Sequence, residues 1–210
     1  MDGKKTSRKM QAAATKEKIY DAALILFEKH GFESVSVDSI VEKAGVSKGG
    51  FYVHFASKDA LMTEMINGYV GKLDLSYQSF MESFSDEVNA CDAILALVDK
   101  IADTMEKIGY DLIKLAYRIH IDQNNRTDKL LSYDRDIYRI FNILIQRGIR
   151  QGELKDELSA EVVSDQFVTV LRGFTYEWCI RYPNFNLKGN LHIHFKLLLC
   201  GIKKQFKGNA

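Results

Sequence analysis

Apolar residues recur every three to four positions along most of the 210-residue chain, which is the spacing of one face of an amphipathic helix. The first such stretch begins near Thr15. Its apolar stripe consists of Ile19, Ala22, Ala23, Leu26 and Phe27. No segment alternates apolar and polar residues over a length that predicts a strand. The pattern therefore predicts an all-α fold.

Two short helices follow the first. Ser36 is placed to cap a helix over residues 36–44, and Ser47 is placed to cap a helix over residues 47–55. Only the tight turn at Gly45-Val46 separates them. Two helices joined by a short glycine-containing turn form the helix-turn-helix signature, whose second helix enters the DNA major groove.

Beyond residue 57 the helical patterns become long. The expected helices span residues 58–84, 88–108, 110–122, 127–151, 159–182 and 188–207. The predicted organisation is a flexible basic arm (1–14), a three-helix domain that contains the helix-turn-helix (15–57) and a six-helix bundle (58–210).

Composition and charge narrow the class of protein. Hydrophobic residues make up 46% of the chain and charged residues 27%, as in an ordinary globular protein, and the net charge is +1. The positive charge gathers at the N-terminal end, where residues 1–20 carry six Lys and Arg side chains against two acidic ones. The sequence has neither a membrane-spanning apolar run nor a signal-peptide pattern, so we expect a cytoplasmic protein with no membrane partner.

The sequence lacks the usual patterns of catalysis and metal binding. Its cysteines form no CxxC pair, and there is no GxSxG, HExxH or phosphate-binding loop. His192 and His194 diverge by about 200° on a helix, so they are poorly placed to share a metal. We therefore expect no enzyme activity, no cofactor and no metal.

A series of short segments in residues 15–61 keeps a characteristic order and spacing. The segments are Thr15-Lys16-Glu17-Lys18-Ile19, Ala22-Ala23, Leu26-Phe27, Gly31-Phe32, Ile40, Ala44-Gly45-Val46-Ser47-Lys48-Gly49, Tyr52, His54-Phe55 and Ser57-Lys58-Asp59-Ala60-Leu61. This region resembles the N-terminal domain of the TetR family of bacterial transcriptional repressors. The resemblance implies a dimer with a DNA-binding domain at the front and a ligand-binding bundle behind it.

The chemistry of the residues and the resemblance together indicate where DNA would bind. Lysine, tyrosine and histidine side chains donate to phosphates, glycines allow close approach of the backbone, and capped helix starts offer free N–H groups. The predicted DNA-binding residues are Ser36, Val37, Ser47, Lys48, Gly49, Gly50, Tyr52, Val53, His54 and Lys58.

Three positions depart from the family pattern and weaken direct reading of bases. Val37 and Asp38 stand where the family often has polar or basic residues, and Asp38 would repel a phosphate. Gly50 replaces a side chain that often contacts a base. We therefore expect the basic arm (Lys4 to Lys18) and DNA shape to contribute more than usual.

The C-terminal part combines apolar stripes with many aromatic residues. The stripes on helices 159–182 and 188–207 exceed what one small bundle must bury, which predicts a homodimer through these two helices. The aromatic residues suit an apolar ligand cavity, and they equally suit a packed core. The candidate ligand-binding residues are Tyr117, His120, Phe141, Phe174 and Trp178.

The sequence thus predicts a DNA-binding transcriptional regulator, specifically a repressor that binds a palindromic operator as a dimer and is released by a small-molecule effector. One alternative is a regulator or nucleoid-associated factor of the same fold that no small molecule gates. Another is a helical small-molecule carrier or enzyme with a vestigial helix-turn-helix. A cavity in the bundle favours the first, a filled core the second, and ligand binding without DNA binding the third.

Overall fold

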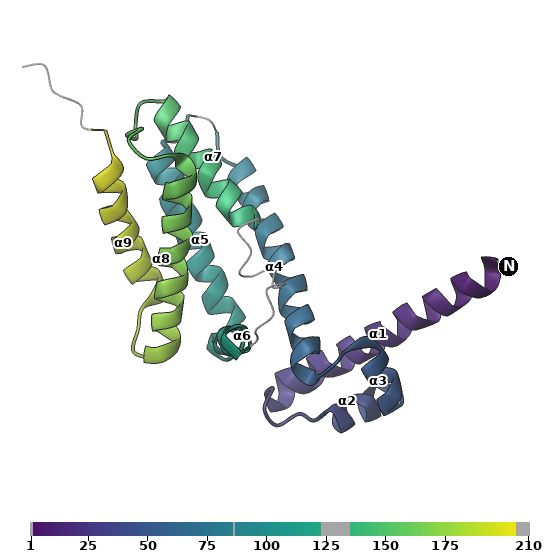
Figure 1. Cartoon of the computed structure of the whole chain (residues 1–210). Helices are drawn as coiled ribbons and strands as arrows, with labels where there is room; N and C mark the ends of the chain where they lie inside the picture. Colours follow the sequence, from purple (N-terminus) through teal and green to yellow (C-terminus); the bar gives the residue numbers. More distant parts are fainter. Residues whose placement is uncertain (1, 86, 123–134, 205–210) are drawn as a thin grey trace, which may run out of the picture. The chain divides into compact units, whose positions relative to one another are not determined.

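A computed structural model describes residues 2–85, 87–122 and 135–204, and within them the side chains of residues 9–85, 87–119, 121 and 135–204 (Figure 1). In these ranges the chain is helical, and the only strand-like feature is one isolated antiparallel bridge between Leu154 and Lys203. The helices are α1 (Asp2–His30), α2 (Val37–Ala44), α3 (Lys48–His54), α4 (Lys58–Glu82), α5 (Ala90–Ile108), α6 (Tyr110–Asp122), α7 (Asp136–Arg150), α8 (Ala160–Arg181) and α9 (Leu187–Ile202). The all-α prediction is confirmed.

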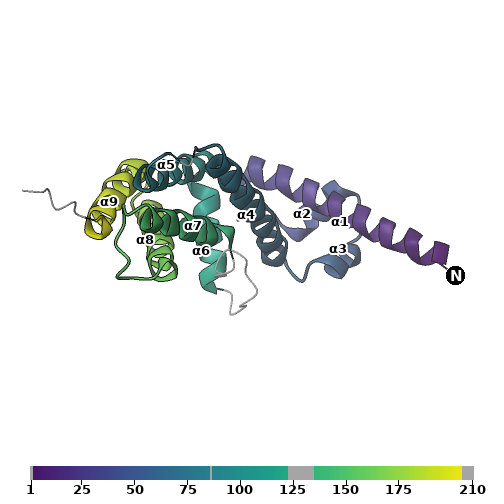
Figure 2. The same ribbon diagram turned by 90° about the horizontal axis from the view of Figure 1, so that it is seen from above.

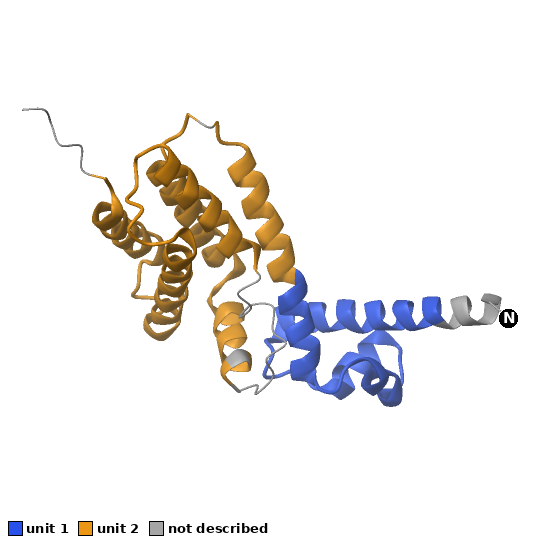
Figure 3. Cartoon of the chain, turned by 45° about the horizontal axis from the view of Figure 1, so that its top comes forward, with its two compact units in different colours: residues 1–68 blue, residues 69–210 orange. Residues whose placement is uncertain are grey.

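The chain forms two compact units, residues 1–68 and 69–210, which meet in sequence inside α4 (Figure 3). The sequence placed the boundary before Lys58, at the start of that helix. The first turns of α4 belong instead to unit 1, and their buried side chains Leu61, Met62 and Met65 add to its apolar interior. None of the described helices combines the length and apolarity needed to cross a bilayer.

In unit 1, α1, α2 and α3 pack against one another. Ile19 of α1, Ile40 of α2 and Phe51 of α3 are fully buried, and Phe55, which follows α3, is nearly so. The rings of Phe51 and Phe55 lie 5.7 Å apart. Of the apolar stripe predicted on the first helix, Ile19, Ala22 and Ala23 are buried and Leu26 and Phe27 half-buried, so this stripe is confirmed.

The first helix begins earlier than the sequence predicted. We expected residues 1–14 to be an arm without secondary structure, but α1 begins at Asp2 and continues through them. Residues 9–14 are exposed, so they show no apolar stripe for a periodicity argument to detect. Lysine, arginine, glutamine, methionine and alanine are nevertheless strong helix formers, and the segment contains no proline.

Unit 2 is built around α5, α7, α8 and α9, with α9 beside both α5 and α8 (Figure 2). Its centre is an aromatic cluster formed by Phe141 of α7, Phe167 of α8 and Phe195 of α9. Ring centroids are 5.6 Å apart for Phe141–Phe167 and 5.1 Å apart for Phe167–Phe195, both edge to face. Such pairs contribute about 0.5–1.5 kcal/mol beyond their buried area.

Two predicted helix ends in unit 2 need comment. We expected the last helix to reach residue 207, but α9 ends at Ile202. There the chain pairs with the segment after α7, through Lys155 N–H to the Ile202 carbonyl (2.8 Å) and Lys204 N–H to the Glu153 carbonyl (2.8 Å). This pairing takes backbone groups that a longer helix would use. The predicted start of the seventh helix, residues 127–134, lies outside the described residues, as do residues 205–207.

The part of α4 in unit 2 presents one buried face, made by Val70, Asp74 and Tyr77. Asp74 is only 4% exposed and accepts two hydrogen bonds from Arg135, from Nη2 at 2.7 Å and from Nε at 3.1 Å. Arg135 stands immediately before α7. A buried, two-point ion pair therefore ties α4 to the start of α7.

Replacing Asp74 by Ala should destabilise unit 2 by about 3 kcal/mol, because it leaves the Arg135 guanidinium buried without its carboxylate. Urea unfolding followed by the fluorescence of Trp178, the single tryptophan, reports on this unit. Asp136→Ala is the matched control, since its pair with Arg139 is exposed and worth less than about 1 kcal/mol. Equal losses in the two variants would contradict a special role for the buried pair.

Candidate nucleic-acid interface and effector site

The two short helices of unit 1 are capped as the sequence predicted. Ser36 Oγ accepts the N–H of Ser39 at 3.1 Å, and Ser39 Oγ accepts the N–H of Ser36 at 3.1 Å, so the two serines form a reciprocal capping box. Ser47 Oγ accepts the N–H of Gly50 at 3.0 Å. Gly45 has φ +66°, a left-handed conformation that favours glycine and ends α2 sharply. We call α2, this turn and α3 the reading head.

The recognition helix α3 has one buried and one open face. Phe51 is buried, whereas Tyr52 is 50% exposed and Val53 is 79% exposed. His54 is half-buried. The exposed tyrosine offers a hydroxyl to a phosphate, and the exposed valine suits a thymine methyl group. The residues predicted to touch DNA on α3 therefore lie on the face that is free to do so.

The two glycines at the start of α3 are not required by packing within the chain. A Cβ at Gly49 would come no closer than 3.9 Å to Ser47 Oγ. A Cβ at Gly50 would approach the same oxygen at 3.3 Å, which is tight but local. Their predicted role, a close approach of the backbone to DNA, stays a prediction.

Lys48 carries an interaction that the sequence did not predict. Its Nζ lies 2.7 Å from Oδ1 of Asp38 on α2. The hydrogen bond to Asp38 raises the pKa of Lys48 above its ordinary value. The sequence identified both residues separately, one as a phosphate donor and the other as a repellent, but their ten-residue separation shows no helical periodicity that would pair them.

Lys58 makes contacts within the chain that the sequence did not predict. Its Nζ donates to the carbonyls of Phe32 (2.7 Å) and Val35 (2.8 Å) and lies 4.2 Å from the centroid of the Phe32 ring. Burial lowers the pKa of this ammonium. The side chain is thus engaged in closing the loop between α1 and α2, and its predicted phosphate contact stays a prediction. These carbonyls converge only in the folded chain, so spacing in the sequence gave no sign of them.

The candidate ligand residues lie in unit 2 with different partners. Phe141 belongs to the central aromatic cluster, and Trp178 packs edge-on against Tyr110 and Tyr182. Phe174 packs against Phe185 and His194. The Tyr117 hydroxyl donates to the Arg172 carbonyl at 2.8 Å, and burial raises its pKa. The side chain of His120 lies outside the described residues.

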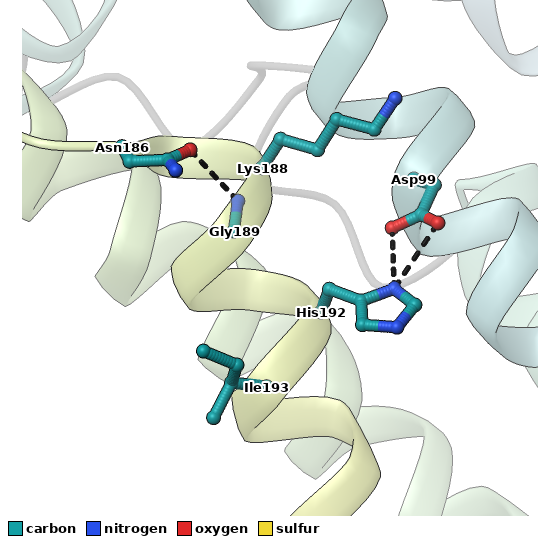
Figure 4. A pocket seen from close by; sticks show the side chains of 6 residues that line it. All are labelled: Asp99, Asn186, Lys188, Gly189, His192 and Ile193. Atoms are coloured by element: carbon teal, nitrogen blue, oxygen red, sulfur yellow. Dashed lines mark hydrogen bonds and ion pairs between the residues drawn. The ribbon is translucent and has the colours of Figure 1, made fainter.

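Two hollows in the described part of unit 2 are not lined by the four candidates just placed. The larger, about 410 Å³, lies between α5 and α9 (Figure 4). Asp99 accepts from His192 Nδ1 there at 2.9 Å, and Lys188 pairs with Asp103 nearby at 2.7 Å. The smaller, about 130 Å³, lies beside Leu154 and Ile202. The sequence therefore did not locate the hollows of this unit.

The apolar stripes assigned to dimerisation are used largely inside the chain. Val163, Phe167 and Leu171 of α8 and Leu191, Phe195 and Leu199 of α9 are buried in the core of unit 2. A second set of apolar side chains on the same helices is exposed, and we call it the α8/α9 face. It comprises Val162, Tyr176, Ile180, Ile193 and Leu197.

Comparison with known proteins agrees with this architecture. Residues 19–65, which contain the reading head, match the family model described as bacterial regulatory proteins, tetR family. The HTH-type transcriptional regulator AcrR of Shigella flexneri is 26% identical over 205 residues, covering 91% of this chain and 90% of its own. The uncharacterized HTH-type transcriptional regulator YfiR of Bacillus subtilis is 28% identical over 161 residues, covering 74% and 75%.

Among solved structures, Thermus thermophilus FadR, a TetR-family transcriptional repressor in complex with lauroyl-CoA, shares the fold with a TM-score of 0.73. Its identity to this chain is 18%, and the match covers 93% of this chain and 98% of that one. The matched reading head, relatives along most of the chain and a shared fold lead to one conclusion. The protein belongs to the TetR family of bacterial transcriptional regulators.

Proposed function

We propose that this protein is a homodimeric transcriptional repressor that binds a palindromic operator and leaves it when a small-molecule effector binds. The observation that supports DNA recognition is that the recognition helix α3 has one buried and one exposed face. Tyr52 and Val53 are exposed on it, while Phe51 fixes its other side in the core. An exposed apolar residue beside a phosphate donor is the combination that a major-groove helix uses.

Phosphate contacts would set the register of this helix on DNA. Ser36 and Ser47 begin α2 and α3, where N–H groups and the positive end of the helix dipole favour an anion. Lys48, Tyr52 and His54 add side-chain donors from α3. The N-terminal part of α1 is rich in lysine and arginine, so we propose that it contacts the DNA backbone as well.

The α8/α9 face supports a dimer of two identical chains. On α8 its members Val162, Tyr176 and Ile180 fall on one helical stripe, and on α9 Ile193 and Leu197 are one turn apart. A contact between identical faces is satisfied by two-fold symmetry. Two reading heads related in this way match a palindrome, whose half-sites recur about 34 Å apart.

Support for an effector comes from the fold neighbour. The FadR of Thermus thermophilus was solved with lauroyl-CoA, so this architecture accommodates a ligand there. In this chain α4 is a suitable lever, because it starts beside the reading head and ends in unit 2. An effector that prefers one position of α4 would shift the population of DNA-competent dimers.

A second candidate function has its own supporting observation. Phe141, proposed as a ligand residue, is fully buried between Phe167 and Phe195 in a filled aromatic cluster. A filled core favours a DNA-binding regulator of the same fold that no small molecule gates. The two candidates share the reading head and differ only in how DNA binding is controlled.

DNA selected by this protein from a random library should converge on a palindrome. Its half-site centres should lie one helical turn, about 10 base pairs, or a multiple of it apart.

Tyr52→Ala should weaken binding to the selected DNA about 10-fold or more in gel shifts, because it removes an exposed donor from α3. Tyr69→Ala is the matched control, because Tyr69 is similarly exposed but lies on α4, outside the reading head. Selection without enrichment would refute sequence-specific binding.

Leu197→Asp should convert the dimer into monomers and raise the dimer dissociation constant at least about 100-fold, because two-fold symmetry places the buried charge twice in one interface. Light scattering after gel filtration measures the mass. Leu75→Asp, at a similarly exposed leucine on α4, should leave the mass unchanged. A wild-type chain that is monomeric at micromolar concentration would exclude the proposed assembly.

Lauroyl-CoA, the ligand of the fold neighbour, should dissociate the protein from its selected DNA if the effector belongs to that class. Gel shifts with increasing lauroyl-CoA measure release, and native mass spectrometry of the purified protein shows any bound small molecule. Free CoA is the control for the acyl chain. A DNA complex that survives saturating ligand, together with a protein that carries no small molecule, would support the ungated candidate.

A further inference from the structure

The reading head contains an internal ion pair at the place where it would meet DNA. Asp38 is the second residue of α2 and Lys48 the first residue of α3, and their charged atoms are 2.7 Å apart. Both side chains are more than half exposed, at 69% and 55% respectively. The pair therefore lies at the surface, where DNA phosphates can compete for the same ammonium.

Lys48 is the more accessible of the two lysines predicted to bind phosphate, because Lys58 is half-buried and already bonded within the chain. Lys58 donates to the carbonyls of Phe32 and Val35. Of the two lysines predicted to bind phosphate, only Lys48 keeps its ammonium at the surface, and Asp38 holds it there. An approaching phosphate competes with the Asp38 carboxylate for this ammonium and is repelled by the negative charge of that carboxylate.

We propose that Asp38 is a specificity-determining residue that suppresses binding to non-operator DNA by holding Lys48 and repelling phosphates. This inference rests on the proposed DNA-binding function. On random DNA, any phosphate that Lys48 contacts lies beside the Asp38 carboxylate, which shares the ammonium and repels the phosphate. On the operator the carboxylate gains a partner, the N4 amino group of a cytosine in the major groove, which is the base donor that Asp and Glu accept.

Replacing Asp38 by Asn tests this proposal, because the amide keeps the shape and removes the charge. Fluorescence anisotropy with a random duplex of about 30 base pairs needs no knowledge of the operator. At about 0.1 M salt the variant should bind this duplex about 5- to 10-fold more tightly for each reading head engaged, because one more phosphate is neutralised. The slope of log affinity against log salt should steepen by about 0.9 for each head.

Two variants separate this effect from a general change of charge. Glu42→Gln removes one negative charge from an exposed position of the same helix, and it should change affinity less than about 2-fold. Asp38→Asn introduced into a Lys48→Gln background should lose most of its gain, because the released ammonium is absent. Thermal unfolding of each variant monitors folding. A destabilised reading head would bind DNA less tightly, so destabilisation cannot produce the expected gain in affinity.

The outcomes are distinct. The proposal is supported if Asp38→Asn raises affinity more for random DNA than for the selected operator. The variant should also tolerate other bases at one cytosine of the operator. Equal effects of Asp38→Asn and Glu42→Gln, or a full gain without Lys48, would overturn it and leave DNA binding intact. A wild-type chain without salt-dependent binding to any duplex would overturn the proposed function as well.

Discussion

Helix α4 runs through both units, and in each unit a charged side chain of this helix is bonded to another segment of the same unit. Lys58 anchors its first residue to the carbonyls of Phe32 and Val35 in unit 1. Asp74 anchors it to Arg135 in unit 2. Apolar contacts tolerate small slips, but a two-point ion pair requires one geometry. Buried charges of this kind contribute more to a unique arrangement than to net stability. A helix fixed in this manner is suited to switching between discrete positions.

In and beside the reading head, lysine ammonium groups are also paired within the chain. A DNA-binding surface gains affinity from every free cation, but that gain is independent of sequence. Lys58, just after this head, bonds to carbonyls of the fold, and Lys48 within the head is paired with Asp38. Few exposed groups remain for the direct reading that we propose, among them Tyr52 and Val53 on the open face of α3. In the proposed mechanism, discrimination between operator and other DNA comes from the pairing of Lys48 with Asp38, which weakens phosphate binding, as much as from contacts to bases.

The sequence predicted the fold well because helical periodicity and capping are local. Ser36, Ser47 and Gly45 mark their boundaries through neighbours within four residues, and the structure uses each as expected. The reading head was predictable for the same reason. Apart from the early start of α1, the failures involve distant partners. The carbonyls that capture Lys58 are more than twenty residues away in sequence, and the pairing that ends α9 at Ile202 comes from the segment after α7. Periodicity also shows which face of α8 is apolar, but it does not say whether Phe167 meets its own chain or a second copy.

The filled core of unit 2 constrains any account of gating. Phe141, Phe167 and Phe195 occupy the centre that a bound molecule would need, so an effector that enters there must select an opened conformation. If that conformation has a population of about 1%, the observed affinity falls about 100-fold below the intrinsic one. The same condition makes the effector strongly selective between the two states, because the closed core offers it no site. Weak apparent binding and strong control of α4 would then have a single cause, namely the packing of these three rings.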